Sequence, residues 1–328
     1  MNRNNKRQFA FGFIACYLFF ASATFALPYT DLYVFGDSLS DTGNLFTASG
    51  NPPPPYYQGR FSNGEVYSEI LATKLGASPL LPSLRGGSNY AWAGALTADD
   101  RPLGGGLIIP SINTQVSTYL GSQGGLASAD ALHIVFGGGN DLAALLNNGF
   151  DSVTGALAAQ LAAANILNSV TTLIAAGADA ILVPNLPDLG LTPLYQGNSA
   201  NANALTQEFN RALTAGLFDL EEVIEFDTFA FLNSVINDFA ESSAPCLTST
   251  TLCDKPQDYL FFDDFHPTTR FYAGYAGALQ LTIAQSQGVP EPRTLFLFGL
   301  GLLCLLRRGQ HVTRLPIQSS LNSTPYPR

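Results

Sequence analysis

The feature that most constrains the fold of this chain is an alternation of short hydrophobic segments with longer helix-like stretches. Four segments have the apolar, β-branched character of buried strands: DLYVFG at 31–36, ALHIVFGG at 131–138, ADAILVPN at 178–185 and EVIEFD at 222–227. Helical patterns occupy about residues 65–75, 152–176, 201–220, 228–240 and 268–285. This alternation predicts an α/β fold in which helices cover both faces of a central parallel sheet.

Residues 27–288 are predicted to form one domain, because no repeat, linker or charge block interrupts the alternation. Between Leu27 and Gly288 the chain has 24 acidic residues and 7 basic ones, a net charge of −17. A domain this acidic repels phosphate backbones, so we expect no nucleic-acid partner.

The N-terminus has the three parts of a secretory signal peptide. Arg3, Lys6 and Arg7 precede an apolar run at 9–20, and small residues follow as far as Ala26. This order predicts a signal peptide at residues 1–26, removed by signal peptidase. The alternative, a membrane-spanning anchor, requires a longer apolar run.

The C-terminal segment combines Pro-Glu-Pro at 290–292, an uncharged stretch at 294–306 and the pair Arg307 and Arg308. This order resembles the PEP-CTERM sorting signal of Gram-negative bacteria, although twenty residues follow the arginines. The resemblance implies a sorting segment at 289–308, an exosortase-type processing partner and a secreted or cell-surface location that includes the extracellular matrix. The alternative is a buried C-terminal helix, and residues 309–328 form a tail of unknown role.

Two of the four cysteines, Cys16 and Cys304, fall in the terminal segments, which leaves Cys246 and Cys253 in the domain. An isolated pair in an exported protein predicts a disulfide that closes a surface loop. A metal site is the alternative, but His266 is the only histidine close to the pair in sequence.

The domain has only two histidines, which limits the possible general bases. His133 lies inside an apolar strand pattern and is predicted to be structural, whereas His266 lies in the polar stretch FFDDFHPTT. Asp263 precedes His266 by three residues, a spacing that allows its carboxylate to orient the imidazole. Asp264 is the competing partner.

Several common site motifs are missing from the sequence. The Gly-x-Ser-x-Gly elbow of α/β-hydrolases is absent, and so are phosphate-binding and dinucleotide-binding glycine loops. The sequence also has no cluster of histidines that would indicate a zinc site. The two polar stretches at 36–44 and 137–141 follow predicted strands, so both should open on the carboxyl edge of the sheet.

Four segments resemble the conserved blocks of the GDSL lipases and esterases, also called SGNH hydrolases. They are FGDSLSDTGN at 35–44, GGSNYAWAGA at 86–95, GGGND at 137–141 and DDFHPT at 263–268. GRFSNGEVYSEILATKLG at 59–76 and VPNLPDLGLTP at 183–193 are similar to the lecithinase and hemolysin-like branch. The resemblance implies a flavodoxin-like three-layer α/β/α sandwich and hydrolysis of esters through an acylated serine.

The resemblance also implies a role for each matching residue. Ser38 is the expected nucleophile, His266 the base and Asp263 its partner. The oxyanion hole is expected to comprise the Ser38 and Gly94 N–H groups and the side chain of Asn140, with Gly87 as the competitor of Gly94. Asp37 is expected to brace the loop, while Asp141 either braces it or faces solvent.

This chemistry requires no metal or organic cofactor. The expected activity is that of an exported serine esterase or lipase acting on acyl esters. Two alternatives remain, namely deacetylation of an extracellular polysaccharide and a non-catalytic binding role at the cell surface.

Overall fold

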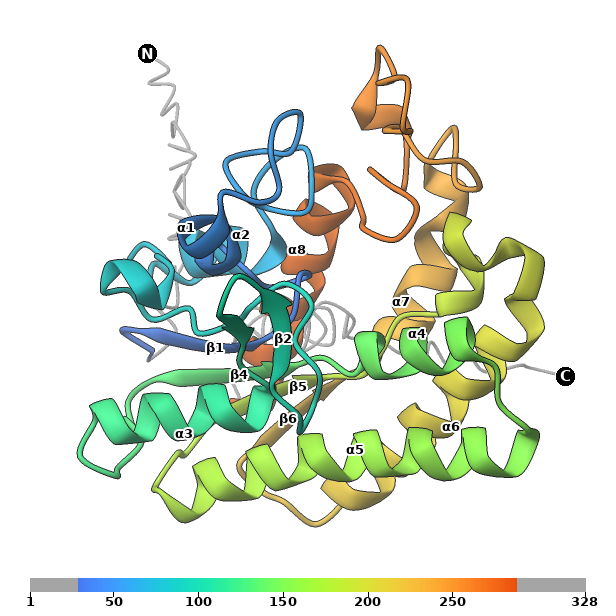
Figure 1. Ribbon diagram of the computed structural model, residues 1–328. Coiled ribbons are helices and arrows are strands. Elements are labelled where there is room, and N and C mark those ends of the chain that lie inside the picture. Colours follow the sequence, from blue (N-terminus) through green and yellow to red (C-terminus); the bar gives the residue numbers. More distant parts are fainter. Residues whose placement is uncertain (1–28, 288–328) are drawn as a thin grey trace, which may run out of the picture.

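The computed structural model describes residues 29–287 and shows a four-stranded, fully parallel sheet with the order β1-β4-β5-β6 (Figure 1). The strands are β1 (Leu32–Gly36), β4 (Leu132–Phe136), β5 (Ile181–Pro184) and β6 (Val223–Phe226). All four strand predictions are confirmed. Every residue of β4 and β5 is buried, which explains their unbroken apolar character.

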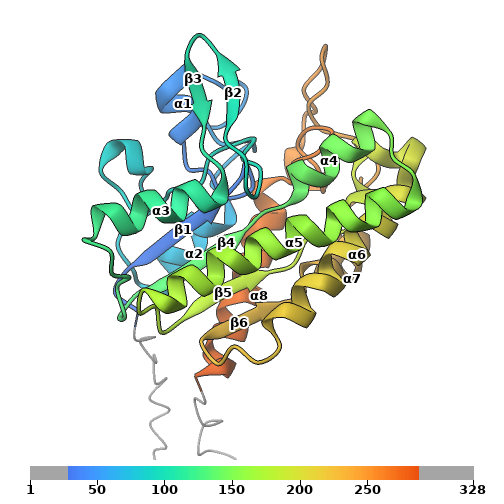
Figure 2. The same ribbon diagram turned by 60° about the horizontal axis from the view of Figure 1, so that its bottom comes forward.

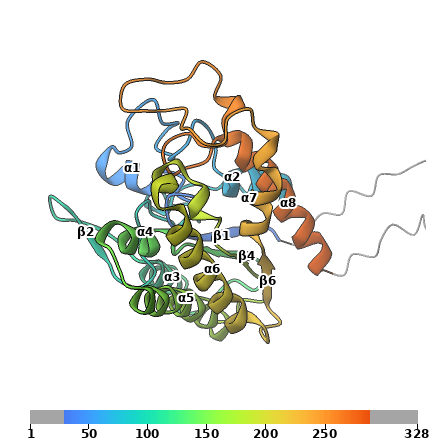
Figure 3. The same ribbon diagram turned by 90° about the vertical axis from the view of Figure 1, so that its right-hand side faces the viewer.

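Helices cover both faces of the sheet (Figures 1 and 3). One layer contains α3 (Ile112–Ser122), α5 (Ser152–Ala175) and α6 (Ser199–Leu217). The other contains α2 (Tyr67–Leu75), α7 (Thr228–Val235) and α8 (Thr269–Ser286). Contacts between α5 and α6, and between α2 and α8, hold each layer together. The predicted three-layer α/β/α sandwich with a central parallel sheet is therefore confirmed.

Some elements were not predicted. The short α1 (Asn44–Ser49) follows the first polar stretch, and α3 begins at the cap Ser111, whose hydroxyl accepts a hydrogen bond from Thr114 N–H. The stretch 137–141, expected to be a loop, instead enters α4 (Gly139–Asn148) directly after Gly138. Gly138 has φ 111°, a left-handed conformation that lets the chain turn from strand into helix within two residues.

A two-stranded antiparallel hairpin, β2 (Arg101–Gly104) and β3 (Leu107–Ile109), was also missed. It projects from the domain beside α1 (Figure 2). All four residues of β2 are exposed, so this strand lacks the buried apolar face that a sequence pattern would reveal.

Helix α5 is long and apolar enough to cross a membrane by length and composition, but it packs against α3, α6 and β4 as part of the sandwich. The proposed signal peptide at 1–26, the sorting segment at 289–308 and the tail at 309–328 lie outside the described residues.

The predicted disulfide between Cys246 and Cys253 is present. It closes a loop that is attached to the chain just before Asp263. The Cys246 N–H donates to the Phe261 carbonyl at 3.1 Å, and the Leu247 N–H donates to that of Phe262.

Candidate active site

Ser38 lies two residues beyond the end of β1, in a tight turn. The Asp37 carbonyl accepts hydrogen bonds from the N–H groups of Ser40 at 3.0 Å and Asp41 at 2.9 Å. Gly36 precedes the turn, and a Cβ at this position would collide with the Phe136 carbonyl of β4. The Gln115 side chain, from α3, bonds both the N–H and the carbonyl of Gly36 at 2.8 and 2.9 Å. The sheet and α3 therefore fix the start of this turn.

A second loop approaches Ser38 because it runs along the free edge of β1. Tyr90 N–H donates to the Val34 carbonyl at 2.7 Å, and Trp92 N–H donates to the Gly36 carbonyl at 3.1 Å. The chain then turns at Gly94, which has a left-handed φ of 83°. A Cβ on Gly94 would meet only the end of the flexible Arg101 side chain, so it is the left-handed conformation that favours glycine here.

Asp41 joins these two loops, and the sequence interpretation missed it. Its Oδ1 accepts from the N–H groups of Gly43 and Asn44, and its Oδ2 accepts from those of Leu45 and Ala93, the last at 2.9 Å. The side chain is fully buried, which raises the pKa of its carboxyl. Asp41 belongs to the same FGDSLSDTGN stretch as Ser38, and that was the only available signal.

The first turn of α4 supplies the third part of the site. The Asn140 side-chain amide donates to the Ala95 carbonyl at 3.0 Å, which places it beside Gly94. Asp141 accepts hydrogen bonds from the N–H and hydroxyl of Thr97, the latter at 2.8 Å. Asp141 therefore braces the loop that carries Gly94, not the loop that carries Ser38 for which bracing was expected.

Ser38, His266 and Asp263 form a continuous hydrogen-bonded series. His266 Nε2 lies 2.8 Å from Ser38 Oγ, and His266 Nδ1 lies 2.8 and 2.9 Å from the two oxygens of Asp263. Asp263 Oδ1 also accepts from the N–H groups of Phe265 and His266. At these distances an imidazole can take the hydroxyl proton while a carboxylate holds its other nitrogen.

Burial alone would raise the pKa of Asp263. The charge and hydrogen bond of His266, together with the two backbone N–H donors, outweigh burial and lower the pKa of Asp263 to about 2. The carboxylate therefore stays ionised over the range in which esters are hydrolysed enzymatically.

The competing residues lie elsewhere. Asp264 is exposed, and among residues 29–287 it forms a hydrogen bond only through its backbone carbonyl, which accepts from Leu194 N–H. His133 is buried in β4 with Nε2 3.0 Å from the Tyr119 hydroxyl, and burial lowers its pKa to about 4. Gly87 N–H donates to the Pro82 carbonyl at 3.1 Å and is not free to bind a ligand.

Two backbone donors near Ser38 remain available. Within residues 29–287, the N–H groups of Ser38 and Gly94 bond to no protein acceptor. Asn140 uses one amide hydrogen for Ala95 and keeps the second. Within the described residues, each of the three groups expected to bind an oxyanion therefore keeps a donor that could do so.

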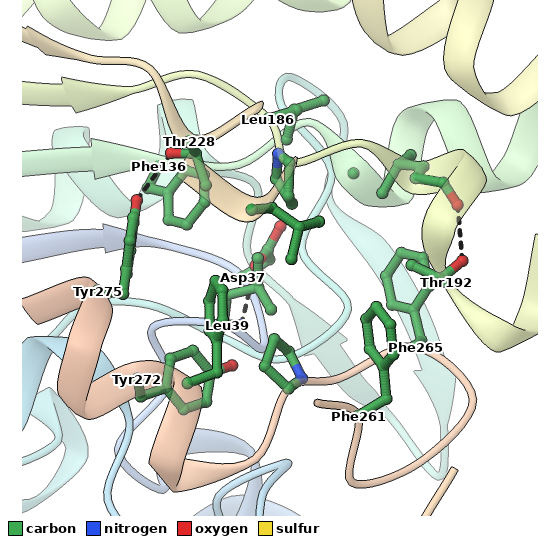
Figure 4. Close-up of a pocket in the computed structure, with 16 residues that line it drawn as sticks. Asp37, Leu39, Phe136, Leu186, Thr192, Thr228, Phe261, Phe265, Tyr272 and Tyr275 are labelled. Carbon is green, nitrogen blue, oxygen red and sulfur yellow. Dashed lines mark hydrogen bonds between the residues drawn. The ribbon is translucent and has the colours of Figure 1, made fainter. Parts of the chain in front are cut away.

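A narrow apolar cavity adjoins the loop that carries Ser38 and the loop that carries His266 (Figure 4). Leu39 and Asp37, on either side of Ser38, line it together with Phe265 and Pro267, on either side of His266. Its space for water-sized molecules is about 30 Å³, enough for a few waters. Most of the remaining lining is apolar and includes the side chains of Phe136, Leu186, Leu189, Leu232, Phe261 and Phe271.

Asp37 is the charged group of this cavity. One carboxylate oxygen accepts from Leu39 N–H at 3.0 Å, as expected for a residue that braces the loop. Its side chain is 3% exposed, and this burial raises its pKa to about 6, although Leu39 N–H and the nearby His266 oppose the shift.

Known proteins were compared with this chain. Lipase 1 of Photorhabdus luminescens is 34% identical over 192 residues, which cover 57% of this chain but only 27% of that protein. A GDSL esterase/lipase of Arabidopsis thaliana is 28% identical over 321 residues, covering 73% of this chain and 83% of the relative. Among solved structures, the native aryl esterase of M. smegmatis aligns with 78% of this chain and 99% of its own, at 16% identity and a TM-score of 0.47.

Two family profiles match the sequence. The PEP-CTERM protein-sorting motif matches residues 288–310, which marks the chain as an exported protein sorted to the cell surface in Gram-negative bacteria. The profile described as GDSL-like Lipase/Acylhydrolase matches residues 32–278, nearly all of the described domain. The chain therefore belongs to the GDSL-like lipase/acylhydrolase family and is a hydrolase of ester bonds.

Proposed function

We propose that this hydrolase is an exported serine esterase or lipase that cleaves carboxylic esters through an acylated Ser38. The observation that carries the proposal is the series of hydrogen bonds from Ser38 Oγ through His266 to Asp263, each 2.8 to 2.9 Å long. This geometry matches the requirement for a nucleophile, a base and an orienting carboxylate.

In the first half of the reaction, Ser38 Oγ attacks the ester carbonyl carbon while its proton moves to His266 Nε2. The carbonyl oxygen becomes negative, and the N–H groups of Ser38 and Gly94 and the amide of Asn140 stabilise it. Each such donor contributes about 3 kcal/mol to the transition state. His266 then gives its proton to the alcohol oxygen as the carbon–oxygen bond breaks.

In the second half, His266 removes a proton from water, and the resulting hydroxide attacks the acyl carbon. The tetrahedral intermediate collapses, the bond to Ser38 Oγ breaks, and His266 returns the proton to Oγ. The carboxylic acid leaves. Throughout both halves Asp263 remains ionised and holds the Nδ1 proton of His266.

The apolar cavity supports a short acyl group as the preferred acid part. It lies between residues that flank Ser38 and residues that flank His266, and about 30 Å³ of its space is open to water-sized molecules. A longer chain would enter only if side chains such as Phe265 moved.

Replacing Ser38 tests the proposal. The S38A variant should lose a factor of at least about 10⁴ in kcat on a short p-nitrophenyl ester, because no other group can form the acyl-enzyme. It should also resist labelling by a fluorophosphonate probe, while its thermal unfolding stays unchanged. Ser40, in the same loop, bonds the Tyr67 hydroxyl at 2.9 Å and offers a matched control, S40A, which should still be labelled. Hydrolysis by S38A at the normal rate would refute the assignment.

A second candidate keeps the same site but changes the ester. The sorting motif at 288–310 directs the chain to the cell surface, where acetylated polysaccharide is a possible substrate. Acetate release from acetylated polysaccharide, compared with fatty-acid release from phospholipid, distinguishes this candidate from a lipase.

A further inference from the structure

Tyr56 contacts the acidic end of the catalytic series although it lies 207 residues from Asp263 in sequence. Its hydroxyl donates to Asp263 Oδ2 at 2.7 Å. The Tyr56 ring is held on two sides, with centroids 5.5 Å from the Phe61 ring and 5.3 Å, edge to face, from the Phe262 ring. These contacts fix the hydroxyl in one place.

Residues 56–63 form a segment that we name the aromatic strap, because it lies across the loop that carries His266. The Phe61 ring lies 4.9 Å from the His266 ring. The Ser62 hydroxyl donates to the Pro267 carbonyl at 2.9 Å, and Asn63 Oδ1 accepts from Thr269 N–H at 2.9 Å. The strap is joined to α2 by the ion pair between Arg60 and Glu69. Tyr56 therefore comes from a segment anchored on both sides.

The hydrogen bonds of Asp263 show what Tyr56 contributes. Oδ1 receives two backbone N–H groups, whereas Oδ2 receives the Tyr56 hydroxyl and shares His266 Nδ1. Within residues 29–287, Tyr56 and His266 are the only side chains that donate to this carboxylate. Donors on both oxygens stop the carboxylate from rotating away from the imidazole.

We propose that Tyr56 is a positioning residue for catalysis, which fixes Asp263 and moderates its hold on the His266 proton. This inference rests on the proposed roles of Ser38, His266 and Asp263. Burial and the adjacent Asp263 charge raise the pKa of Tyr56, so the phenol remains a donor at all working pH values. The other titratable groups that interact with Tyr56, Asp263 or His266 are Asp37, Asp264 and Tyr272.

The Y56F variant provides the test, since it keeps the ring and removes only the hydroxyl. We expect kcat to fall about tenfold and KM to change less than about twofold, because a lost hydrogen bond to a charged group acts here on Asp263 and not on the substrate. A carboxylate without the phenol donor holds the imidazolium proton more firmly, so the acid limb of the pH profile should move up by about half a unit.

The matched control is Y57F. Tyr57 is the next residue, is 37% exposed, and its hydroxyl bonds no protein group within residues 29–287, so kcat and the pH profile should not change. In a D263N background, Y56F should cost less than about twofold, because its effect acts through Asp263.

Three results would overturn the inference: a Y56F variant equal to wild type in kcat and pH profile, a loss confined to KM, or an undiminished loss in the D263N background. The S38A variant separates this failure from that of the proposed function. If S38A is inactive and Y56F behaves as wild type, only the role of Tyr56 is wrong; if S38A is active, the catalytic assignment itself is wrong.

Discussion

The loop that carries Ser38 and the loop that carries His266 meet at one hydrogen bond, but they are anchored in different ways. The nucleophile half, residues 36–44 and 88–97, is tied to the sheet and to itself through buried groups such as Asp41, Asn44 and Asn89. The base half, residues 245–269, has no strand in the main sheet. It depends on a disulfide, aromatic contacts and the aromatic strap.

This difference indicates that the two halves should respond differently to substitution. Changes at the buried anchoring residues of the nucleophile half, such as Asp41, remove contacts of the core and should affect folding. Leu260 and Phe261 of the base half belong to the core, but many of its other residues are exposed. Changes at these exposed positions should affect catalysis more than global stability.

The largest effect on stability is expected for D41A. It removes the acceptor of four N–H groups, one of them on the loop that carries Gly94. Water would replace some of these hydrogen bonds, so the free energy of unfolding should fall by about 4 kcal/mol. Urea denaturation measures this free energy. The control is D264A in the base half, an exposed site that should change stability by less than about 0.5 kcal/mol. Equal losses in the two variants would contradict the comparison.

The pKa values of Asp37 in the nucleophile half and Asp263 in the base half shift in opposite directions. The pKa of Asp37 is raised from 3.8 to about 6 by burial, so its contribution to stability is complete below pH 3.8 and is lost as the pH rises through 6. The lowered pKa of Asp263 acts in reverse, and its contribution is lost only as the pH falls from 3.8 through about 2.

Between pH 4 and 7.5, therefore, only wild type should lose the Asp37 contribution. The stability of D37N relative to wild type should rise by about 2.4 kcal/mol over this range, since each pKa unit corresponds to about 1.4 kcal/mol and part of the contribution is already lost at pH 4. Urea denaturation at both pH values measures the change, and the titrating groups that do not interact with Asp37 cancel between the two proteins. A constant difference would show that Asp37 titrates normally.

A smaller loss of stability than that of D41A is expected when the disulfide is removed. The C246S/C253S variant opens a loop whose ends are seven residues apart, and closing so short a loop contributes only about 2 kcal/mol. Because this loop bonds the carbonyls of Phe261 and Phe262, just before Asp263, kcat should fall severalfold as well. Treating wild type with a reductant should reproduce both changes. Loss of stability without loss of activity would show that this disulfide loop does not help to position His266.

Much of the fold could be predicted because its signals are local. The strands of the sheet could be predicted from their apolar, β-branched segments. Helical periodicity likewise predicted α2, α5, α6, α7 and α8. The hairpin at 101–109 could not be found in this way, since exposed β2 has no apolar face. Nor could the start of α4, because a glycine-rich stretch is compatible with loop, turn or helix entry.

The chemical types in the site follow from the sequence alone: a serine just after a strand, a histidine in a polar stretch, an aspartate three residues before it, and the one cysteine pair of residues 27–288. Which distant groups contact them depends on the tertiary structure. Asp41 reaches Ala93, Asn140 reaches Ala95, and Tyr56 reaches Asp263 across 207 residues. Local patterns specify strands and turns, whereas these contacts depend on how β1, its edge loop and the aromatic strap pack together, and no short-range pattern encodes that packing.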